Sequence, residues 1–337
     1  MEKADIKPLK QYDYVQNLSL AQEGAELLKQ GKAGCLIVAG GQGTRLGYNG
    51  PKGCFEISSG VTLFSMLSKK IHRSSFQSGR KLPVAIMTSQ GNHQETVDYF
   101  KSHQYFELDP DQIDFFIQDE LPVLSLEGTA MLDAEGNTIE APAGNGVSLN
   151  AFAAQGLAKK WKSLGVEQVT FVQVDNLLSD PFDPLLLAYQ SQGGQDVTLK
   201  AGLRGDTAEK VGVIVELNGR PGIVEYMEMD DEERIALNAH GKLLHACANL
   251  GMYCFRLDFI QKLYDMKALS LMPLHQARKS IPQANDELGY KSEYFIFDVL
   301  PFSEKTRVLL YPREDCFAPL KDRKDLDFLK TLLPKLN

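Results

Sequence analysis

A short apolar run that breaks abruptly into glycines is the feature that most constrains the fold of this chain. Residues 36–38, Leu-Ile-Val, are followed at residues 40–47 by Gly-Gly-Gln-Gly-Thr-Arg-Leu-Gly. Such a run is typical of a buried parallel strand, and here it ends in a loop that can approach a ligand closely. Because glycine has no Cβ, the amides of Gly40, Gly41 and Gly43 can turn inward and surround an anion.

Two cations follow these glycines. Arg45 offers a rigid planar fork of donors, and Lys52, preceded by Pro51, offers a point charge. Both side chains suit phosphate oxygens. A glycine-rich turn without a ligand has no need of these two residues, so the loop is predicted to bind a phosphate-bearing ligand.

Two commoner phosphate-binding motifs do not fit the loop. A P-loop requires Gly, four residues and then Gly-Lys-Ser/Thr, which this stretch lacks. A dinucleotide fingerprint requires Gly-x-Gly-x-x-Gly opening a helix, whereas Gly41 and Gly43 are followed by Gly47, one position late. A strand-like run at residues 54–57 then follows instead of a helix. A nicotinamide-dependent oxidoreductase is therefore a weak alternative.

The order of apolar patterns predicts the fold class. Helices are expected in the lead-in before about Lys32, after Thr62, after Asn92 and from Ser148 to about Gly165. Buried strands are expected at residues 84–89, 113–118, 169–176 and 246–255. This alternation predicts a doubly wound, mostly parallel, Rossmann-like α/β sheet. Turn signals at residues 123–140 predict an added β-ribbon, and residues 294–300 are predicted to be a buried helix or strand.

Composition narrows the classes of function. The formal net charge of -8 excludes a general nucleic-acid binder but leaves room for a nucleotide, which local cations can bind. The first residues lack the apolar core of a signal peptide, and no stretch reaches transmembrane length, so we expect a cytoplasmic protein that does not bind membranes. The five cysteines contain no Cys-x-x-Cys pair, which argues against a disulfide framework or a structural zinc site.

The motif Gly-Gly-x-Gly-Thr-Arg-Leu-Gly-x-x-x-Pro-Lys at residues 40–52 resembles the signature of the eukaryotic-type UDP-sugar pyrophosphorylases, and most closely the UDP-N-acetylhexosamine pyrophosphorylase branch. Further matches continue to about Lys321. The resemblance implies that UTP and a sugar 1-phosphate react to give a UDP-sugar and pyrophosphate, with Mg²⁺ as the cofactor. A phosphate monoester has its second pKa at about 6 and is mostly dianionic at neutral pH, so this reaction requires no general base.

The resemblance also assigns residues to the site. Asp175 follows the strand at residues 169–174 at the edge where α/β sheets bind ligands, and it matches a metal-binding carboxylate; a helix cap or a turn residue is the alternative. The Gln118 amide matches a base-reading position, although by itself it could be a polar residue at a strand end. The full implied set is Arg45, Lys52 and Lys321 for catalysis, Gly40, Gly41, Gly43, Thr44, Gln118 and Gly144 for the nucleotide, Asn145, Gly212, Glu225 and Asn249 for the sugar, and Asp175 for the metal.

The predicted organisation is a helical lead-in at residues 1–32, a nucleotidyltransferase catalytic domain at residues 33–315 and a short C-terminal segment at residues 316–337. A sugar-side lobe is expected at about residues 200–256. The acidic run at residues 228–236 is interpreted as a solvated surface segment. We expect a monomer or a weak homo-oligomer.

The leading hypothesis is an N-acetylglucosamine 1-phosphate uridylyltransferase. The pair Gly144-Asn145 favours the amino sugar, because the glucose branch more often has histidine at the matching position. Ala248, Met252, Tyr253 and Val147 depart from the pattern of the branch and leave the choice of sugar open. A UDP-glucose or broad UDP-sugar pyrophosphorylase is the alternative within the class, and a catalytically silent nucleotide-sugar-binding protein is the alternative from another class.

Overall fold

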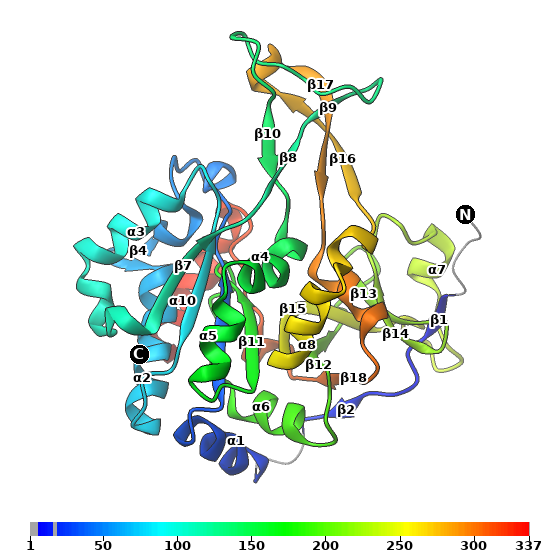
Figure 1. The fold of residues 1–337 in the computed structure, drawn as a ribbon. Coiled ribbons are helices and arrows are strands. Elements are labelled where there is room, and N and C mark those ends of the chain that lie inside the picture. The colour runs from blue at the N-terminus through cyan, green and yellow to red at the C-terminus, as the bar shows by residue number, and fades with distance from the viewer. Residues whose placement is uncertain (1–5, 16–18, 337) are drawn as a thin grey trace.

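The central sheet has the strand order β2-β18-β12-β15-β11-β3-β6-β7 in a computed structural model that describes residues 6–15 and 19–336 (Figure 1). All neighbours on this path pair in parallel except β15, which is antiparallel to both β12 and β11. The predicted doubly wound, mostly parallel sheet is therefore confirmed. The strands are β2 (Asp13–Tyr14), β18 (Thr306–Leu310), β12 (Val197–Leu203), β15 (Cys247–Arg256), β11 (Gln168–Gln173), β3 (Ala33–Val38), β6 (Val84–Thr88) and β7 (Ile113–Ile117).

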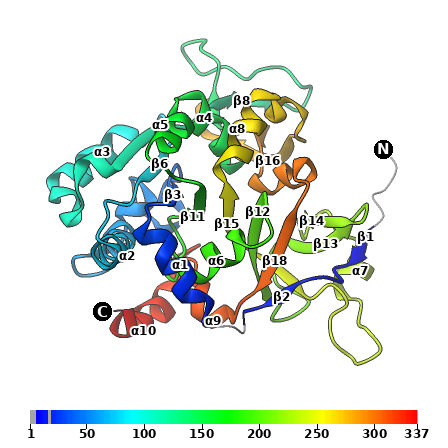
Figure 2. The same cartoon turned by 60° about the horizontal axis from the view of Figure 1, so that its bottom comes forward.

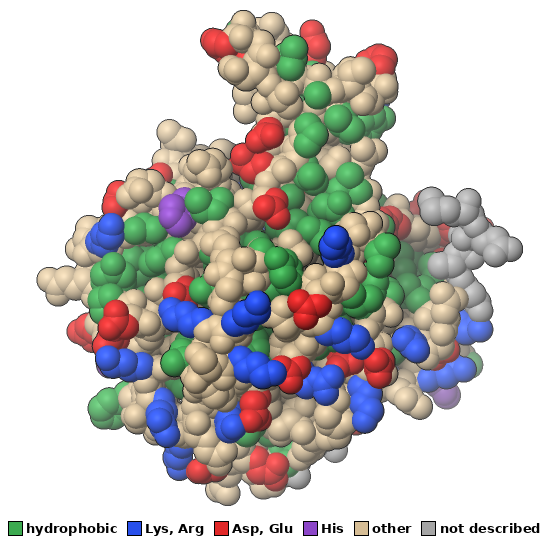
Figure 3. Space-filling view, in the orientation of Figure 1, with side chains coloured by type: hydrophobic (Ala, Val, Ile, Leu, Met, Phe, Trp, Pro, Cys, Tyr) green, Lys and Arg blue, Asp and Glu red, His purple; other side chains and the backbone are tan. Residues whose placement is uncertain are grey.

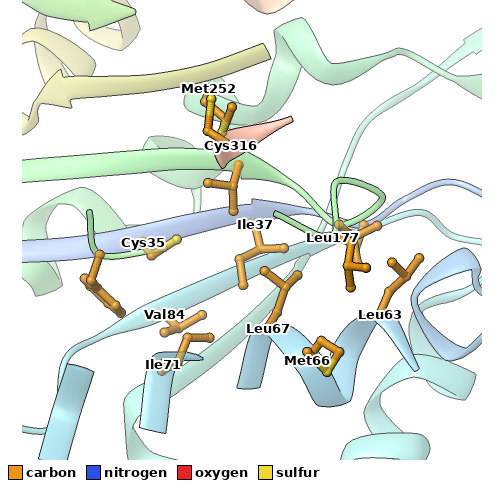
Figure 4. Close-up of a cluster of buried hydrophobic side chains, with 14 of the residues drawn as sticks. Cys35, Ile37, Leu63, Met66, Leu67, Ile71, Val84, Leu177, Met252 and Cys316 are labelled. Atoms are coloured by element: carbon orange, nitrogen blue, oxygen red, sulfur yellow. The ribbon is translucent and has the colours of Figure 1, made fainter. Parts of the chain in front are cut away.

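Helices cover both faces of this sheet (Figure 2). Successive residues of a strand point to opposite faces, so Cys35 and Ile37 of β3 belong to one buried cluster and Leu36 to the other. Figure 4 shows Ile37 packed towards Leu67 of the first helix layer. That layer contains α1 (Leu20–Lys29), α2 (Leu63–Ser78), α3 (His93–Ser102), α6 (Pro184–Ser191) and α10 (Leu326–Leu336), and the other contains α4 (Ser148–Ala154), α5 (Leu157–Ser163) and α8 (Leu257–Asp265).

A β-rich arm projects from one end of the body (Figure 1). The predicted ribbon is confirmed as the antiparallel pair β8 (Glu120–Pro122) and β10 (Glu140–Pro142). The arm also contains the hairpin of β16 (His275–Ile281) and β17 (Glu287–Glu293), which pairs with β9 (Leu124–Ser125) and was not predicted. A side branch of the main sheet holds β1 (Ile6–Pro8), β13 (Val213–Leu217) and β14 (Arg220–Val224), and β4 (Glu56–Ser58) pairs with β5 (Val61–Thr62).

Three local predictions need correction. Among the described residues of the lead-in, the helix begins at Leu20, and β1 and β2 instead pair with β13 and β18; the predicted helical position Leu18 lies outside the described residues. The single helix expected from Ser148 is divided into α4 and α5 at Gly156, whose φ of +77° is a left-handed conformation that suits glycine. Ser148 is itself the first helical residue rather than a cap, and its buried hydroxyl has no hydrogen-bond partner among the described residues. Residues 294–300 were predicted to be a buried helix or strand, and most of them form the 3₁₀ helix Ile296–Phe302, which agrees with the helix alternative.

Charged side chains on the face shown in Figure 3 are mixed in sign over the lower half of the body and do not form one basic surface. The short helix α7 (Asp231–Ile235) lies in the acidic run and has no buried residue, as expected for a solvated segment. Within residues 6–15 and 19–336, no helix combines the length and the apolar character needed to cross a membrane.

A sealed ion pair joins α6 to the centre of the sheet. The ammonium of Lys200 on β12 is fully buried and is bonded to Asp183. The Tyr311 hydroxyl donates to Asp183 Oδ2 at 2.9 Å, and the Leu185 amide donates to Asp183 Oδ1 at 2.8 Å, where it caps α6. Removing one partner of such a pair leaves an uncompensated charge in the core.

We therefore expect Lys200→Met to lower the free energy of unfolding by about 3–5 kcal/mol, measured by urea denaturation. The control is Lys162→Met, which breaks the exposed pair with Asp258, whose two side chains are 67% and 63% exposed. That control should cost less than about 1 kcal/mol. Equal losses of the free energy of unfolding in the two variants would show that the buried Lys200–Asp183 pair contributes no more to stability than an exposed pair does.

Candidate functional site

The site forms where the parallel strands β3, β7 and β11 end. Their carboxyl ends meet at one edge of the sheet, so the residues that follow each strand come together. Gly40 follows β3, Gln118 follows β7 and Asp175 follows β11. The sequence analysis predicted all three as site residues, and the structure places them along the same edge.

One ion pair connects the glycine loop to the strand at the centre of the sheet. Lys52 Nζ lies 2.7 Å from Asp175 Oδ2, across 123 residues of sequence. The two side chains are 16% and 20% exposed, so the pair is reachable by a ligand but is shielded from bulk solvent. The predicted phosphate-binding lysine and the predicted metal-binding carboxylate are therefore bonded to each other.

The glycine loop is closed by its own hydrogen bonds. The Gly43 amide donates to the Gly50 carbonyl at 2.9 Å, and the Lys52 amide donates to the Gly41 carbonyl at 3.0 Å. A Cβ at Gly43 would lie 2.7 Å from the Tyr48 ring, so glycine is needed there for packing. Because its amide is already satisfied, Gly43 shapes the loop and has no amide left for an anion.

The other amides of the loop remain open. In the described part of the chain, the amides of Gly40, Gly41 and Thr44 donate to no protein acceptor. Arg45 is exposed, and its guanidinium has no ion pair or hydrogen bond with any described residue. These groups are free to meet an anion at the loop.

Gln118 lies against Gly40 in a cavity of about 440 Å³. A Cβ on Gly40 would be only 2.0 Å from Gln118 Nε2, so this position of the amide requires glycine. Gln118 Oε1 is buried and has no hydrogen-bond partner among the described residues. An unpaired buried oxygen is costly, and a donor on a ligand would satisfy it.

The same cavity is also lined by Gly144 and Asn145. Gly144 has a φ of +92°, and a Cβ there would lie 2.6 Å from the Tyr294 carbonyl oxygen. Asn145 Oδ1 accepts from the Ile296 amide at 2.9 Å, which leaves the NH₂ group of Asn145 for a ligand. The 3₁₀ helix that begins at Ile296 therefore orients a predicted site residue.

Sequence reasoning missed three charged residues of this cavity, Glu120, Lys291 and Glu293. Glu120 begins β8, and the other two come from β17 of the hairpin that was not predicted. The turn residues Asn285 and Asp286, both at positive φ, were a local signal that could have revealed the hairpin. The flanking strands are mostly polar and exposed, so they lack the apolar alternation used to find strands.

A second cavity, of about 170 Å³, contains most of the residues predicted for the sugar and the metal. Glycine at position 212 leaves room for Glu225, because a Cβ there would lie 3.1 Å from Glu225 Oε1. The Gly212 carbonyl accepts a hydrogen bond from the backbone N–H of Asn249 at 2.8 Å. Burial raises the pKa of Glu225, and the nearby Glu228 carboxylate raises it further. The predicted residues that line this cavity are Asp175, Gly212, Glu225, Asn249 and Lys321.

The remaining predicted cation is at the rim. The Lys321 side chain is exposed, and no described residue pairs with its ammonium. Its backbone amide donates to Asp325 Oδ2 at 2.7 Å, which fixes the segment after α9 (Arg313–Cys316). Lys321 and Arg45 are thus free, whereas Lys52 is paired.

Asp175 is the residue best placed to hold a metal ion. Within the described ranges, no group of three or more His, Cys, Asp or Glu side chains could hold one alone. A single partly exposed carboxylate beside a phosphate-binding loop fits Mg²⁺, which is usually bound by one or two carboxylates together with substrate phosphates.

His275 joins three segments of the chain close to Glu225, and its charge acts on that carboxylate. Its Nδ1 lies 3.0 Å from Glu228 Oε1 and its Nε2 lies 2.9 Å from Asp298 Oδ2, so it connects the turn after β14, the start of β16 and the 3₁₀ helix. These bonds, that to Asp298 first, raise the pKa of His275 to about 9. With both nitrogens occupied, His275 is not positioned to take a proton from a substrate.

The two bonds of His275, to Glu228 and to Asp298, are called the clamp below, and they predict that the stability of the protein depends on pH. A histidine with a pKa raised from 6.5 to about 9 contributes stability that is complete below pH 6.5 and lost as the pH rises through 9. We expect the wild-type protein to lose about 1–3 kcal/mol over this interval relative to His275→Gln, measured by urea denaturation at several pH values. The exposed control His240→Gln should retain the wild-type profile. Parallel profiles for the wild type and His275→Gln would refute the clamp.

The fold and the site together define a Rossmann-like α/β protein of the nucleotidyltransferase type, with a glycine loop, free cations and a carboxylate at the ends of parallel strands. Residues 1–336 match the family model described as UTP–glucose-1-phosphate uridylyltransferase, and the chain belongs to this family. The resemblance seen in the motif at residues 40–52 is thereby confirmed.

Individual relatives agree with this placement. A Schizosaccharomyces pombe protein named "Probable UDP-N-acetylglucosamine pyrophosphorylase" is 32% identical over 345 residues, which cover 95% of this chain and 72% of the relative. The Arabidopsis thaliana UDP-N-acetylglucosamine diphosphorylase 2 is 35% identical, and the match covers 89% of this chain but only 63% of that protein. The crystal structure of the Trypanosoma brucei UDP-N-acetylglucosamine pyrophosphorylase with an inhibitor has a TM-score of 0.88 and 28% identity, covering 98% of this chain and 73% of that one.

Proposed function

We propose that the protein is a uridylyltransferase that makes UDP-N-acetylglucosamine and pyrophosphate from UTP and N-acetylglucosamine 1-phosphate. The observation that carries this proposal is that Lys52 is bonded to one residue from each of two cavities. The Lys52 backbone is bonded to Gly41, which lines the Gln118 cavity, and the Lys52 side chain is bonded to Asp175, which lines the second cavity. A nucleotide and a sugar placed in the two cavities would have their phosphates near Lys52.

The chemistry needs control of charge rather than a base. A phosphate oxygen of the sugar phosphate attacks the α-phosphorus of UTP in line, and the bond to the leaving pyrophosphate breaks. Arg45 and the loop amides would hold the β- and γ-phosphates, Lys52 the α-phosphate and Lys321 the sugar phosphate. Fixed cations of this kind hold two anions together and stabilise the charge that moves onto the leaving group.

Mg²⁺ is part of the proposal. Asp175 would hold the ion, which when bound supplies positive charge to the phosphate oxygens. Lys52 is the present partner of Asp175. When the nucleotide binds, its phosphate would offer the Lys52 ammonium a second anionic partner besides the Asp175 carboxylate.

Uridine would occupy the cavity of Gly40 and Gln118. There the unpaired Gln118 Oε1 would accept a hydrogen bond from the base edge. Gly144 and the free NH₂ group of Asn145 would face the ribose and the sugar. We also propose a cytoplasmic monomer or weak homo-oligomer that does not bind nucleic acid.

Substitution of Lys52 tests the catalytic assignment. We expect Lys52→Ala to lower turnover by a factor of about 10²–10³ or more, with a smaller loss in UTP affinity, because the charge acts mainly on the transition state. Pyrophosphate release and UTP titration measure the two effects. The exposed lysine of α5 provides the control Lys159→Ala, which should behave as wild type. Unchanged turnover in Lys52→Ala would remove Lys52 from the mechanism.

The sugar is tested by pyrophosphate release with N-acetylglucosamine 1-phosphate and glucose 1-phosphate in parallel. We expect the N-acetyl substrate to have the higher kcat/KM, and a strong preference for glucose would favour the UDP-glucose alternative. Thermal stabilisation by UTP, UDP-glucose and UDP-N-acetylglucosamine gives an independent ranking, since a ligand of the native state raises apparent stability with its concentration relative to Kd. Binding without turnover of either sugar would indicate a silent nucleotide-sugar-binding protein.

A further inference from the structure

Asn249 lies where β15 bulges away from β12. The pairing of the two strands shifts register opposite residues 249–253. Gly251 in the bulge has a φ of +69°, and a Cβ there would lie 2.6 Å from Gln173 Nε2. The bulge brings the Tyr253 hydroxyl and the Asn249 amide, four residues apart on one strand, within bonding distance.

The oxygen of the Asn249 side chain is held by two donors. The Gly251 amide donates to Asn249 Oδ1 at 3.0 Å, and the Tyr253 hydroxyl donates to the same atom at 3.0 Å. Because a backbone N–H can only donate, the atom facing Gly251 must be the oxygen and not the nitrogen of the amide. The NH₂ group is then the part of Asn249 that is left for the cavity, and no described residue accepts from it.

Tyr253 is a rigid support for this arrangement. Its side chain is fully buried. Its ring lies 5.7 Å from that of Phe171, edge to face, and 5.6 Å from that of Phe255, nearly stacked. Burial raises the pKa of the Tyr253 phenol well above its ordinary value, so the hydroxyl remains a donor at any working pH.

We propose that Tyr253 is a positioning residue for the sugar. The Tyr253 hydroxyl occupies the oxygen of the Asn249 side chain, so that Asn249 can only donate a hydrogen bond to a ligand. The inference rests on the proposed function and adds to it the chemistry of one contact. A sugar group that faces Asn249 must accept, whereas one that faces the Glu225 carboxylate across the same cavity must donate. A sugar ring with neighbouring hydroxyl groups fits a site with Asn249 as donor and Glu225 as acceptor. Tyr253 affects the sugar only through Asn249.

Tyr253→Phe tests the proposal because it removes the hydroxyl and retains the ring. A hydrogen bond to a neutral group is typically worth about 1 kcal/mol, so we expect KM for the sugar 1-phosphate to rise about three- to tenfold. KM for UTP should change less than about twofold, because the nucleotide would occupy the other cavity. In an Asn249→Ala background the same substitution should add almost nothing. The control is Tyr189→Phe, which removes a hydroxyl that bonds the Tyr14 carbonyl far from the site and should leave both KM values unchanged.

A second variant tests the donor directly. Asn249→Asp retains an oxygen for Tyr253 and Gly251 but replaces the free NH₂ group by an acceptor. We expect KM for the sugar 1-phosphate to rise more than about tenfold, because an unpaired acceptor would then face an acceptor of the ligand. An unchanged KM in this variant would overturn the assignment of Asn249 as a donor.

Failure of the inference can be told apart from failure of the proposed function. Three results in an active wild-type background would refute the role of Tyr253. Tyr253→Phe could leave KM for the sugar 1-phosphate at the wild-type value, it could raise this KM and the KM for UTP equally, or it could have its full effect in the Asn249→Ala background. If the wild type releases no pyrophosphate from either sugar phosphate, the proposed function is refuted.

The role of Tyr253 can then still be tested by NMR. The ¹⁵N-labelled side-chain amide signals of Asn249 are assigned by their loss in Asn249→Ala. A shift of these signals in Tyr253→Phe supports the bond between the Tyr253 hydroxyl and the Asn249 oxygen, and unshifted signals overturn it.

Discussion

The bond between Lys52 and Asp175 is the interaction on which the site depends. It joins the loop after β3 to the residue that follows β11, and these two strands are neighbours in the centre of the sheet. The Lys52 amide is bonded to Gly41, which lines the nucleotide-side cavity, and Asp175 lines the sugar-side cavity. The parallel sheet thus brings a cation and an anion from distant parts of the chain into one pair that links residues of both cavities.

Two groups of charged residues have distinct roles in the fold and in the site. Lys200 and Asp183 are sealed in the core, where they bind each other and stabilise the fold. Arg45 and Lys321 are exposed at the rim of the site without a partner in the described chain, and Lys52 is only partly shielded. Free cations cost little in water and gain most when a phosphate arrives, so this distribution suits a protein that handles two anionic substrates. His275, with both nitrogens occupied, agrees with a reaction that needs no proton acceptor from the protein.

The strands β3, β6, β7, β11 and β15, and the edge that carries the site, could be predicted because their signals are local, whereas β12 and β18 of the same sheet were not predicted. Each buried strand is a short apolar run, and the glycines and the polar residues at its end mark the edge of the sheet. The short strand β1 could not be predicted, since it exists only through pairing with β13, more than 200 residues later. The hairpin of β16 and β17 escaped because its strands are mostly exposed and polar.

Within the site, the sequence identified the residue types but not their orientation. The family resemblance placed Asn249 near the sugar, and a side-chain amide can in principle both donate and accept. The bulge at Gly251 and the buried Tyr253 use its oxygen and leave a donor. Likewise Gly43 matches the motif, yet its amide closes the loop on Gly50. Such assignments depend on the exact backbone geometry of a bulge or a loop, which decides which atoms of nearby residues come within bonding distance and which a pattern of residue types does not contain.

A crystal structure with bound UDP-N-acetylglucosamine tests the central claim most directly. The predicted result places the uracil beside Gln118 Oε1, the diphosphate at Lys52 and the sugar ring between Glu225 and the NH₂ group of Asn249. A nucleotide bound away from residues 40–52, or a uracil in the cavity of Glu225, would contradict the claim that the Lys52–Asp175 pair links residues of both cavities.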